Sequence, residues 1–223
     1  MALYKEEKQR VAEICQILLE RGYLKTTEGN ISVRVSGQPA FAITPSSYDY
    51  ALMKVDDICV LNFDLTQLEG ERKPSIESAM HAAVYQTRPD VHTIIHTHQP
   101  YASALGIMNK PIPHLFDEQV RFLGRSVEII PYAPSGTSFL KKNVQKKIES
   151  GNNAFILQNH GVLVFGVDTE RAIHNMALLE KCALVYLLAI FSDEKVSHIP
   201  LAVREIVFSK LRADEKKFEA LDL

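Results

Sequence analysis

The sequence predicts one α/β domain in which helices cover a mixed β-sheet. Segments with helical periodicity alternate with short apolar or alternating runs that are typical of strands, and no repeat, low-complexity run or long linker divides them. The chain has 223 residues, of which 46% are hydrophobic and 23% charged, so it is long enough to bury a substantial core. We therefore expect a single domain over residues 1–223. The more polar stretch from about residue 195 to 223 is expected to form a C-terminal tail or lid.

The first half of the chain contains a helix, three strands and a second helix. Apolar residues recur at helical spacing over residues 11–19, and Gly22 stands where a C-cap is expected. Three short strands follow, at residues 31–35, 40–43 and 57–61, the first two as a hairpin. Pro74 and Ser75 then open a helix that ends before Pro89.

The second half alternates in the same way. Four strands are expected, at residues 91–95, 127–130, 154–158 and 162–165. Thr137 or Ser138 caps a lysine-rich helix that runs to Gly151. Asp168 starts the longest helix, which ends near Phe191.

Charge and cysteine content argue against several classes of function. The net charge of −2 offers no basis for binding nucleic acid or an anionic membrane. No apolar stretch is expected to reach the length of a membrane span, and the charged amino terminus lacks the apolar core of a secretion signal. Cys15, Cys59 and Cys182 lie in apolar segments without CxxC spacing, which indicates buried free thiols in a reducing compartment. We therefore expect a cytoplasmic protein.

Three histidines follow apolar runs at the ends of two expected strands. His96 and His98 are two residues apart, so a strand directs both side chains to the same face. His160 follows the second run about sixty residues later. Three imidazole nitrogens that leave one coordination position open form the catalytic kind of zinc site. The pattern predicts a divalent metal here, and the alternative is a group of surface histidines at strand ends.

Polar groups near the start of the second expected helix are suited to acid–base chemistry and to anion binding. Glu77 is expected in the first turn of this helix, where the helix dipole alone also favours a carboxylate. Ser75 and the free backbone amides of that turn are suited to binding an anion. Two polar loops, at residues 26–32 and 44–47, can join this site, although taken in isolation each is more often just a turn.

Five motifs follow one another along the chain: Gly29-Asn30-Ile31-Ser32, Ile43-Thr44-Pro45-Ser46, Pro74-Ser75-x-Glu77, His96-x-His98 and Asn159-His160-Gly161. In this order, over about residues 11–189, they resemble the class II aldolase/adducin family, which includes fuculose-phosphate aldolase and ribulose-phosphate 4-epimerase. The resemblance implies an α/β/α fold with a central, largely antiparallel sheet, and a homotetramer with sites between subunits. It also implies that His96, His98 and His160 bind Zn²⁺, or Mn²⁺, Co²⁺ or Fe²⁺, and that Glu77 is the acid–base residue.

The resemblance further implies that Asn30, Ser46, Ser47 and Ser75 hold a substrate phosphate. Two departures from the family pattern bear on this point. Ile76 stands where fuculose-phosphate aldolase has a second phosphate-binding serine, and Ser47 replaces a glycine whose backbone the phosphate approaches. A carboxylate or an unphosphorylated sugar is therefore an alternative substrate.

A third departure concerns a second acid–base group. Asp117 and Glu118 lie near the position where the aldolase has a tyrosine that reaches into a neighbouring subunit's site. Either carboxylate could act as an acid–base residue, as an epimerase or a dehydratase requires. The alternative is that both are solvated charges on a helix.

These residues favour a metal enzyme that acts on a small sugar derivative. A divalent ion polarises the carbonyl and hydroxyl oxygens of a ketose and stabilises an enediolate, while a nearby carboxylate moves the proton. We therefore expect an aldolase that cleaves a small ketose phosphate. The first alternative is an epimerase, dehydratase or decarboxylase acting on a sugar phosphate or a sugar acid. The second is a non-catalytic, adducin-like interaction module, which the three histidines and Glu77 disfavour.

Overall fold

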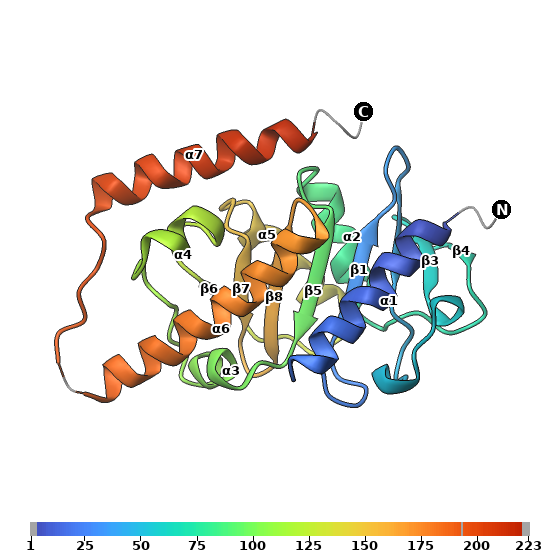
Figure 1. Cartoon of the computed structure of the whole chain (residues 1–223), viewed down its shortest axis with the longest axis horizontal. Helices are drawn as coiled ribbons and strands as arrows, with labels where there is room; N and C mark the ends of the chain where they lie inside the picture. Colours follow the sequence, from blue (N-terminus) through green and yellow to red (C-terminus); the bar gives the residue numbers. More distant parts are fainter. Residues whose placement is uncertain (1–3, 193, 220–223) are drawn as a thin grey trace.

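The computed structural model describes residues 4–192 and 194–219, which form a sheet of eight strands with helices on both faces (Figure 1). The strands are β1 (Asn30–Arg34), β2 (Ala40–Ile43), β3 (Cys59–Asn62), β4 (Gln67–Glu69), β5 (Thr93–Thr97), β6 (Glu128–Ile130), β7 (Ala154–Leu157) and β8 (Gly161–Gly166). Their order in the sheet is β4-β3-β2-β1-β5-β8-β7-β6. Within the described residues β6 and β7 pair in parallel and every other neighbouring pair is antiparallel. The mixed, largely antiparallel sheet is thus confirmed.

The helices cover the two faces of the sheet. They are α1 (Lys5–Glu20), α2 (Ser78–Thr87), α3 (Pro100–Ile107), α4 (Asp117–Phe122), α5 (Ser138–Ile148), α6 (Thr169–Phe191) and α7 (Leu201–Glu219), with short 3₁₀ turns at Tyr50–Leu52 and Val55–Asp57. Helices α1, α3 and α6 pack on one face of the sheet, and α2 and α5 on the other. Helix α7 lies along α4 at the margin of the molecule.

Successive residues of the central strands enter two separate cores. Ile95 and Val164 pack beneath α1 and α6, whereas Ile94 and Phe165 pack beneath α2 and α5. This division arises because a strand turns successive side chains to opposite faces of the sheet. His96 has the parity of Ile94, so its imidazole lies on the face where α2 begins.

Several helix boundaries agree with the sequence, and one does not. Thr137 caps α5 by accepting a hydrogen bond from the Leu140 amide, and Asp168 caps α6 in the same way. Helix α2 begins at Ser78, so the expectation that Glu77 lies inside its first turn was wrong. Residues 75–78 form a turn in which the Ser78 amide donates to the Ser75 carbonyl, and Glu77 is the N-cap residue.

Strand β4 and helix α3 had no clear signal in the sequence. β4 has only three residues, none of them buried, so it lacks the alternation that marks a half-buried strand. Helix α3 is short and apolar around most of its circumference, so its sequence shows no stripe that distinguishes a helix from other buried structure. Both elements are defined by the neighbours they pack against.

Helix α6 is long and apolar enough to span a membrane by length and composition, so the expectation that no segment reaches that length was wrong. Half of its most apolar window is buried inside the protein. Its buried Asn175 donates to the Phe165 carbonyl of β8, and its Glu180 accepts hydrogen bonds from the Tyr101 and Ala102 amides at the start of α3. These contacts make α6 a core helix of this fold.

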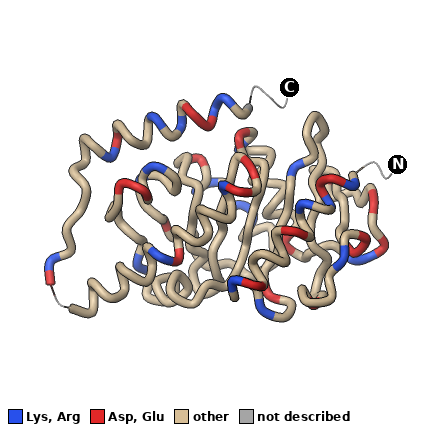
Figure 2. The backbone as a smooth tube through the Cα atoms, in the orientation of Figure 1, with Lys and Arg blue, Asp and Glu red and all other residues tan. Residues whose placement is uncertain are grey.

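The C-terminal helix α7 is fixed to the body by a small apolar contact and a charged network. Phe208 and Leu211 pack on Val120 of α4. Charges of both signs alternate along the rest of the helix (Figure 2). Thus α7 is a docked helix, and its expected role as a tail or lid stays a prediction.

The charged network joins α7 to the end of the sheet at which β5 and β7 begin. Arg212 donates to Asp90 at 2.9 Å and pairs with Glu215, which also accepts a hydrogen bond from Asn153 at 2.7 Å. Asp90 is held further by two hydrogen bonds from Arg88. Because Asp90, Glu215 and Asn153 are buried, losing one partner leaves a charge without compensation.

We expect Arg212→Ala to weaken the docking of α7 by about 3–5 kcal/mol, because Glu215 then lies buried beside Asp90 without its cation. Hydrogen exchange of the α7 amides and denaturant unfolding measure this effect. The matched control is Lys217→Ala, which breaks an exposed pair with Asp214 on the same helix and should leave stability nearly unchanged. Equal effects of the two variants would contradict the proposed anchor.

Candidate active site

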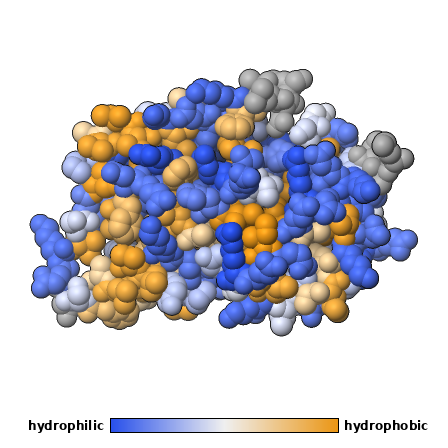
Figure 3. Space-filling view, viewed as in Figure 1, coloured by the Kyte–Doolittle hydropathy of each residue, from blue (hydrophilic) through white to orange (hydrophobic). Residues whose placement is uncertain are grey.

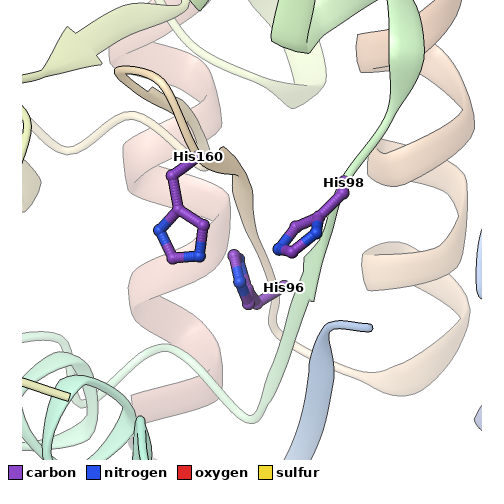
Figure 4. Close-up of side chains that lie close together, drawn as sticks. All are labelled: His96, His98 and His160. Carbon is purple, nitrogen blue, oxygen red and sulfur yellow. The ribbon is translucent and has the colours of Figure 1, made fainter. Parts of the chain in front are cut away.

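Three imidazoles meet at one end of the sheet (Figure 4). His96 lies in β5, His98 follows one residue after that strand, and His160 lies in the turn between β7 and β8. Their candidate ligand nitrogens all lie within 4.8 Å of one another. The structure therefore brings together the three residues that the sequence singled out.

The backbone around these histidines is packed too tightly for side chains at two positions. A Cβ atom at Gly29 would lie 2.5 Å from the His96 carbonyl oxygen. A Cβ atom at Gly161 would lie 2.5 Å from the Thr97 carbonyl oxygen and 2.6 Å from His98 Cδ2. Glycine at both positions lets β1 and β8 approach the end of β5, which is where the histidines emerge.

The donor atoms fit a divalent metal. His96 Nδ1 donates to the Val162 carbonyl at 2.8 Å, so its Nε2 carries the free lone pair. Nε2 of His96 and Nε2 of His98 are buried, and neither has a hydrogen-bond partner within the described residues. Such atoms are rare in folded proteins unless an ion or water satisfies them. Burial, followed by the nearby His96, lowers the pKa of His98 and of His160 to about 4, which favours the neutral form that binds metal at both residues.

Glu77 is turned into this cluster and makes no side-chain capping bond to α2. Its Oε2 lies 3.1 Å from His96 Nε2 and accepts a 2.8 Å hydrogen bond from Asn30 Nδ2. Its Oε1 lies 3.6 Å from His160 Nε2 and has no hydrogen-bond partner within the described residues. Burial raises the pKa of this carboxyl, but His96, Asn30 and His160 outweigh that effect and hold the pKa well below its usual value. A charged oxygen is therefore held beside the metal-ligand candidates.

Asn30, Ser46, Ser47 and Ser75, which the resemblance assigned to the substrate, all line a pocket of about 260 Å³ that opens beside the histidines. A short backbone bridge brings two loops together there. The Ser46 amide donates to the Lys73 carbonyl at 2.9 Å, and the Ser75 amide donates to the Thr44 carbonyl at 3.2 Å. Ser47 has a φ of 53°, the left-handed conformation that a glycine adopts without strain.

Two further pocket residues had little or no signal in the sequence. Glu28 Oε2 lies 3.7 Å from His98 Nδ1, and Ser135 Oγ lies 3.4 Å from His160 Nε2. Glu28 belongs to the polar 26–32 loop that was already a candidate, although the residue itself was not singled out. Ser135 lies in a loop after β6 whose sequence gave no indication of function.

Asp117 and Glu118 are not among the residues that line the pocket. They begin helix α4 and are exposed. Glu118 lies 3.3 Å from Lys181 and 3.5 Å from His174, both on α6. Within one chain the two carboxylates therefore stand apart from the histidine cluster, and a role across a subunit interface stays a prediction.

The sequence matches the Class II Aldolase and Adducin N-terminal domain family over residues 9–187. It is 32% identical over 184 residues to the 5-deoxy-D-ribulose 1-phosphate aldolase of Bacillus thuringiensis serovar kurstaki, which covers 82% of this chain and 85% of the relative. It is 30% identical over 171 residues to an L-fuculose phosphate aldolase of Methanococcus maripaludis, with coverage of 77% and 91%. The solved structure of an L-fuculose 1-phosphate aldolase superposes with a TM-score of 0.87 and 34% identity, covering 93% of this chain and 96% of the other. The chain therefore belongs to the class II aldolase/adducin family.

We expect His98→Ala to lose bound divalent metal while the fold persists, because the ligands join strands that are already packed together. Elemental analysis after dialysis measures the metal, and circular dichroism checks the fold. The control is His174→Ala, which removes a half-exposed imidazole that is not part of the cluster and should keep full occupancy. Full occupancy in His98→Ala would remove this residue from the ligand set.

Proposed function

We propose that this protein is a metal-dependent aldolase that cleaves a small ketose phosphate. The observation that carries the proposal is a buried carboxylate, Glu77, held between a cluster of three histidines and a serine-lined pocket. The family and the names of the sugar-phosphate aldolases that it resembles support the same reaction class. The complete histidine set and Glu77 favour an enzyme over a non-catalytic interaction module.

His96, His98 and His160 would hold the divalent ion, with Zn²⁺ the first candidate because the donors are three imidazole nitrogens. When bound, this ion supplies Lewis-acid stabilisation for negative charge that develops on the ketose oxygens. The Val162 carbonyl keeps His96 in the tautomer and orientation that a metal ligand needs.

Glu77 would move the proton at the carbon next to the ketose carbonyl. Its Oε1 is the oxygen suited to this task, because Oε2 already accepts a hydrogen bond from Asn30. Its lowered pKa keeps the group in the ionised form, which is the form that can accept a proton. The reaction direction decides whether Glu77 removes that proton or returns it.

The serine-lined pocket would hold the phosphate and orient the sugar. Ser46, Ser47 and Ser75 offer hydroxyl groups within one cavity, next to the turn that leads into α2. Binding energy from such a remote group improves the alignment of the reacting atoms. Ile76 adds no donor at the position after Ser75, so we expect weaker phosphate binding than in fuculose-phosphate aldolase.

We further propose that the protein works in the cytoplasm as a homo-oligomer, with a tetramer as the first candidate. The three cysteines are buried and unpaired, as a reducing compartment favours. Apolar side chains are exposed on several helices, among them Ile107, Leu188, Phe191 and Leu201. Figure 3 shows apolar patches on the face in view. Exposed apolar surface of this kind favours association, and light scattering of the native particle tests it.

A panel of sugar phosphates, assayed for aldehyde release with and without a chelator, tests the proposed function. We expect at least one small ketose 1-phosphate to be cleaved and the chelator to abolish its cleavage. The unphosphorylated sugar is the matched control and should be a much poorer substrate. Equal cleavage of both forms would reject the phosphate pocket, and full activity after metal removal would reject metal dependence.

For Glu77→Gln we expect turnover to fall by about 10²- to 10⁴-fold, because an amide cannot accept the proton. Metal content and substrate affinity should change little, since the two side chains have nearly the same shape. Proton exchange at the carbon beside the carbonyl of dihydroxyacetone phosphate, followed by NMR in heavy water, measures the step directly. Equal exchange by wild type and variant would move the proton role to Asp117 or Glu118.

A further inference from the structure

A chain of buried hydrogen bonds runs behind Glu77 into the core beneath α2. Asn30 Nδ2 donates to Glu77 Oε2 at 2.8 Å, and Asn30 Oδ1 lies 2.5 Å from His81 Nε2. His81 Nδ1 lies 2.6 Å from Ser32 Oγ, which in turn lies 2.7 Å from the Tyr85 hydroxyl. Asn30 and Ser32 come from β1, whereas His81 and Tyr85 come from α2, so the chain joins two elements far apart in the sequence.

The chemistry of each group determines which atom donates and which accepts in every hydrogen bond of this series. Asn30 Oδ1 only accepts, so His81 Nε2 must carry the hydrogen, and Nδ1 of the neutral ring then accepts from Ser32. Ser32 has one hydrogen, so the Tyr85 hydroxyl donates to Ser32 Oγ in preference to the His92 carbonyl, which lies further away at 3.4 Å. Every donor in the chain therefore points toward Glu77.

The chain is shielded from solvent. His81 and Ser32 have no exposed surface, and Tyr85 is also buried. Burial, followed by the charge of His96, lowers the pKa of His81 to about 3, which agrees with a neutral ring. Burial raises the pKa of Tyr85, so its hydroxyl keeps its proton. Within the described residues His81 forms no ion pair with a carboxylate, and a neutral buried histidine is unsuited to exchange protons with substrate but can fix the geometry of its neighbours.

We propose that His81 is a positioning residue that sets the orientation of the Asn30 amide and, through it, of the Glu77 carboxylate. Without the Nε2 hydrogen of His81, the Asn30 amide is free to rotate by half a turn and present its oxygen to Glu77. The partly negative amide oxygen would then face the negative carboxylate and displace it. With His81 in place, Asn30 occupies Oε2, and Oε1 stays free beside His160.

The first test measures the tautomer of His81 in the resting protein loaded with Zn²⁺. Nitrogen-15 NMR of histidine-labelled protein, with His81→Gln to assign the signal, distinguishes the two ring nitrogens. We expect the hydrogen on Nε2 and an unprotonated Nδ1. A hydrogen on Nδ1, or a doubly protonated ring, would overturn the proposal. This measurement needs no substrate, so its result does not depend on the proposed aldolase function.

The second test, which rests on the proposed function, compares two substitutions of His81. His81→Phe keeps a ring but removes both nitrogens, and we expect kcat to fall by about 10- to 100-fold, as misplacement of a reacting group causes. KM and metal content should stay within about threefold of wild type. His81→Gln retains an amide donor at the place of Nε2 and should recover most of the lost kcat.

The matched control is Val84→Ala, one turn further along α2 and buried in the core beneath the helix. It should lower the melting temperature without lowering kcat. If kcat instead follows melting temperature across the three variants, or if His81→Gln is as slow as His81→Phe, His81 acts only in packing and the proposal is wrong.

If His81→Phe does not fold, Ser32→Ala replaces it. A lower kcat with metal retained then supports the proposed hydrogen-bond chain, and an unchanged kcat rejects it. If wild type cleaves no sugar phosphate, the proposed function fails, and the tautomer still decides the role of His81.

Discussion

The site depends on the close packing of strand β5 between β1 and β8. Gly29 and Gly161 allow the neighbouring backbones to reach the last residues of β5, where any Cβ atom would collide with carbonyl oxygens. Because the strand is held from both sides, His96 and His98 leave it at fixed positions, and the β7–β8 turn delivers His160 to the same point. The cluster is therefore built from rigid sheet and from a turn between strands, which suits a metal site that must keep its geometry when a substrate arrives.

Glu77 places a negative charge in the protein interior, where burial by itself disfavours the ionised form. Burial alone raises the pKa of a carboxyl, yet the imidazoles and the Asn30 amide reverse that effect and keep Glu77 ionised. The buried hydrogen-bond chain through His81 supports the same arrangement from behind. Such an assembly of polar groups gives little net stability compared with an apolar core of the same volume. In the proposed function its value lies in holding one charged oxygen, Oε1, where proton transfer would require it.

One end of the sheet carries the histidine cluster, and the other end carries the residues that anchor α7. The ends of β5 and β7 carry the histidines, and the opposite ends carry Asp90 and Asn153, which fasten α7 through Arg212 and Glu215. Helix α7 is thereby joined to the body on the side away from its own chain's pocket. The pocket itself lies among loops that lead into or out of β1, β2, β5 and α2, so changes in those loops can alter the substrate without disturbing the core.

The sequence by itself determined the strands that carry the histidines, because parity along a strand and the apolar run before it are local properties. His96, His98 and His160 could be grouped on that ground, and the order of the motifs pointed to Glu77 and the serines. Only the tertiary structure decided that Glu77 stands just before the first turn of α2 and that Glu28 and Ser135 line the pocket. It also decided where α7 docks. Each of these depends on contacts between segments far apart in the chain, such as that between Asp90 and Arg212. Such contacts produce no periodic sequence pattern in either segment, so they cannot be predicted from the sequence. Strand β4 and helix α3 escaped detection for the same reason, since the packing of their neighbours stabilises them and their own sequences carry no clear pattern.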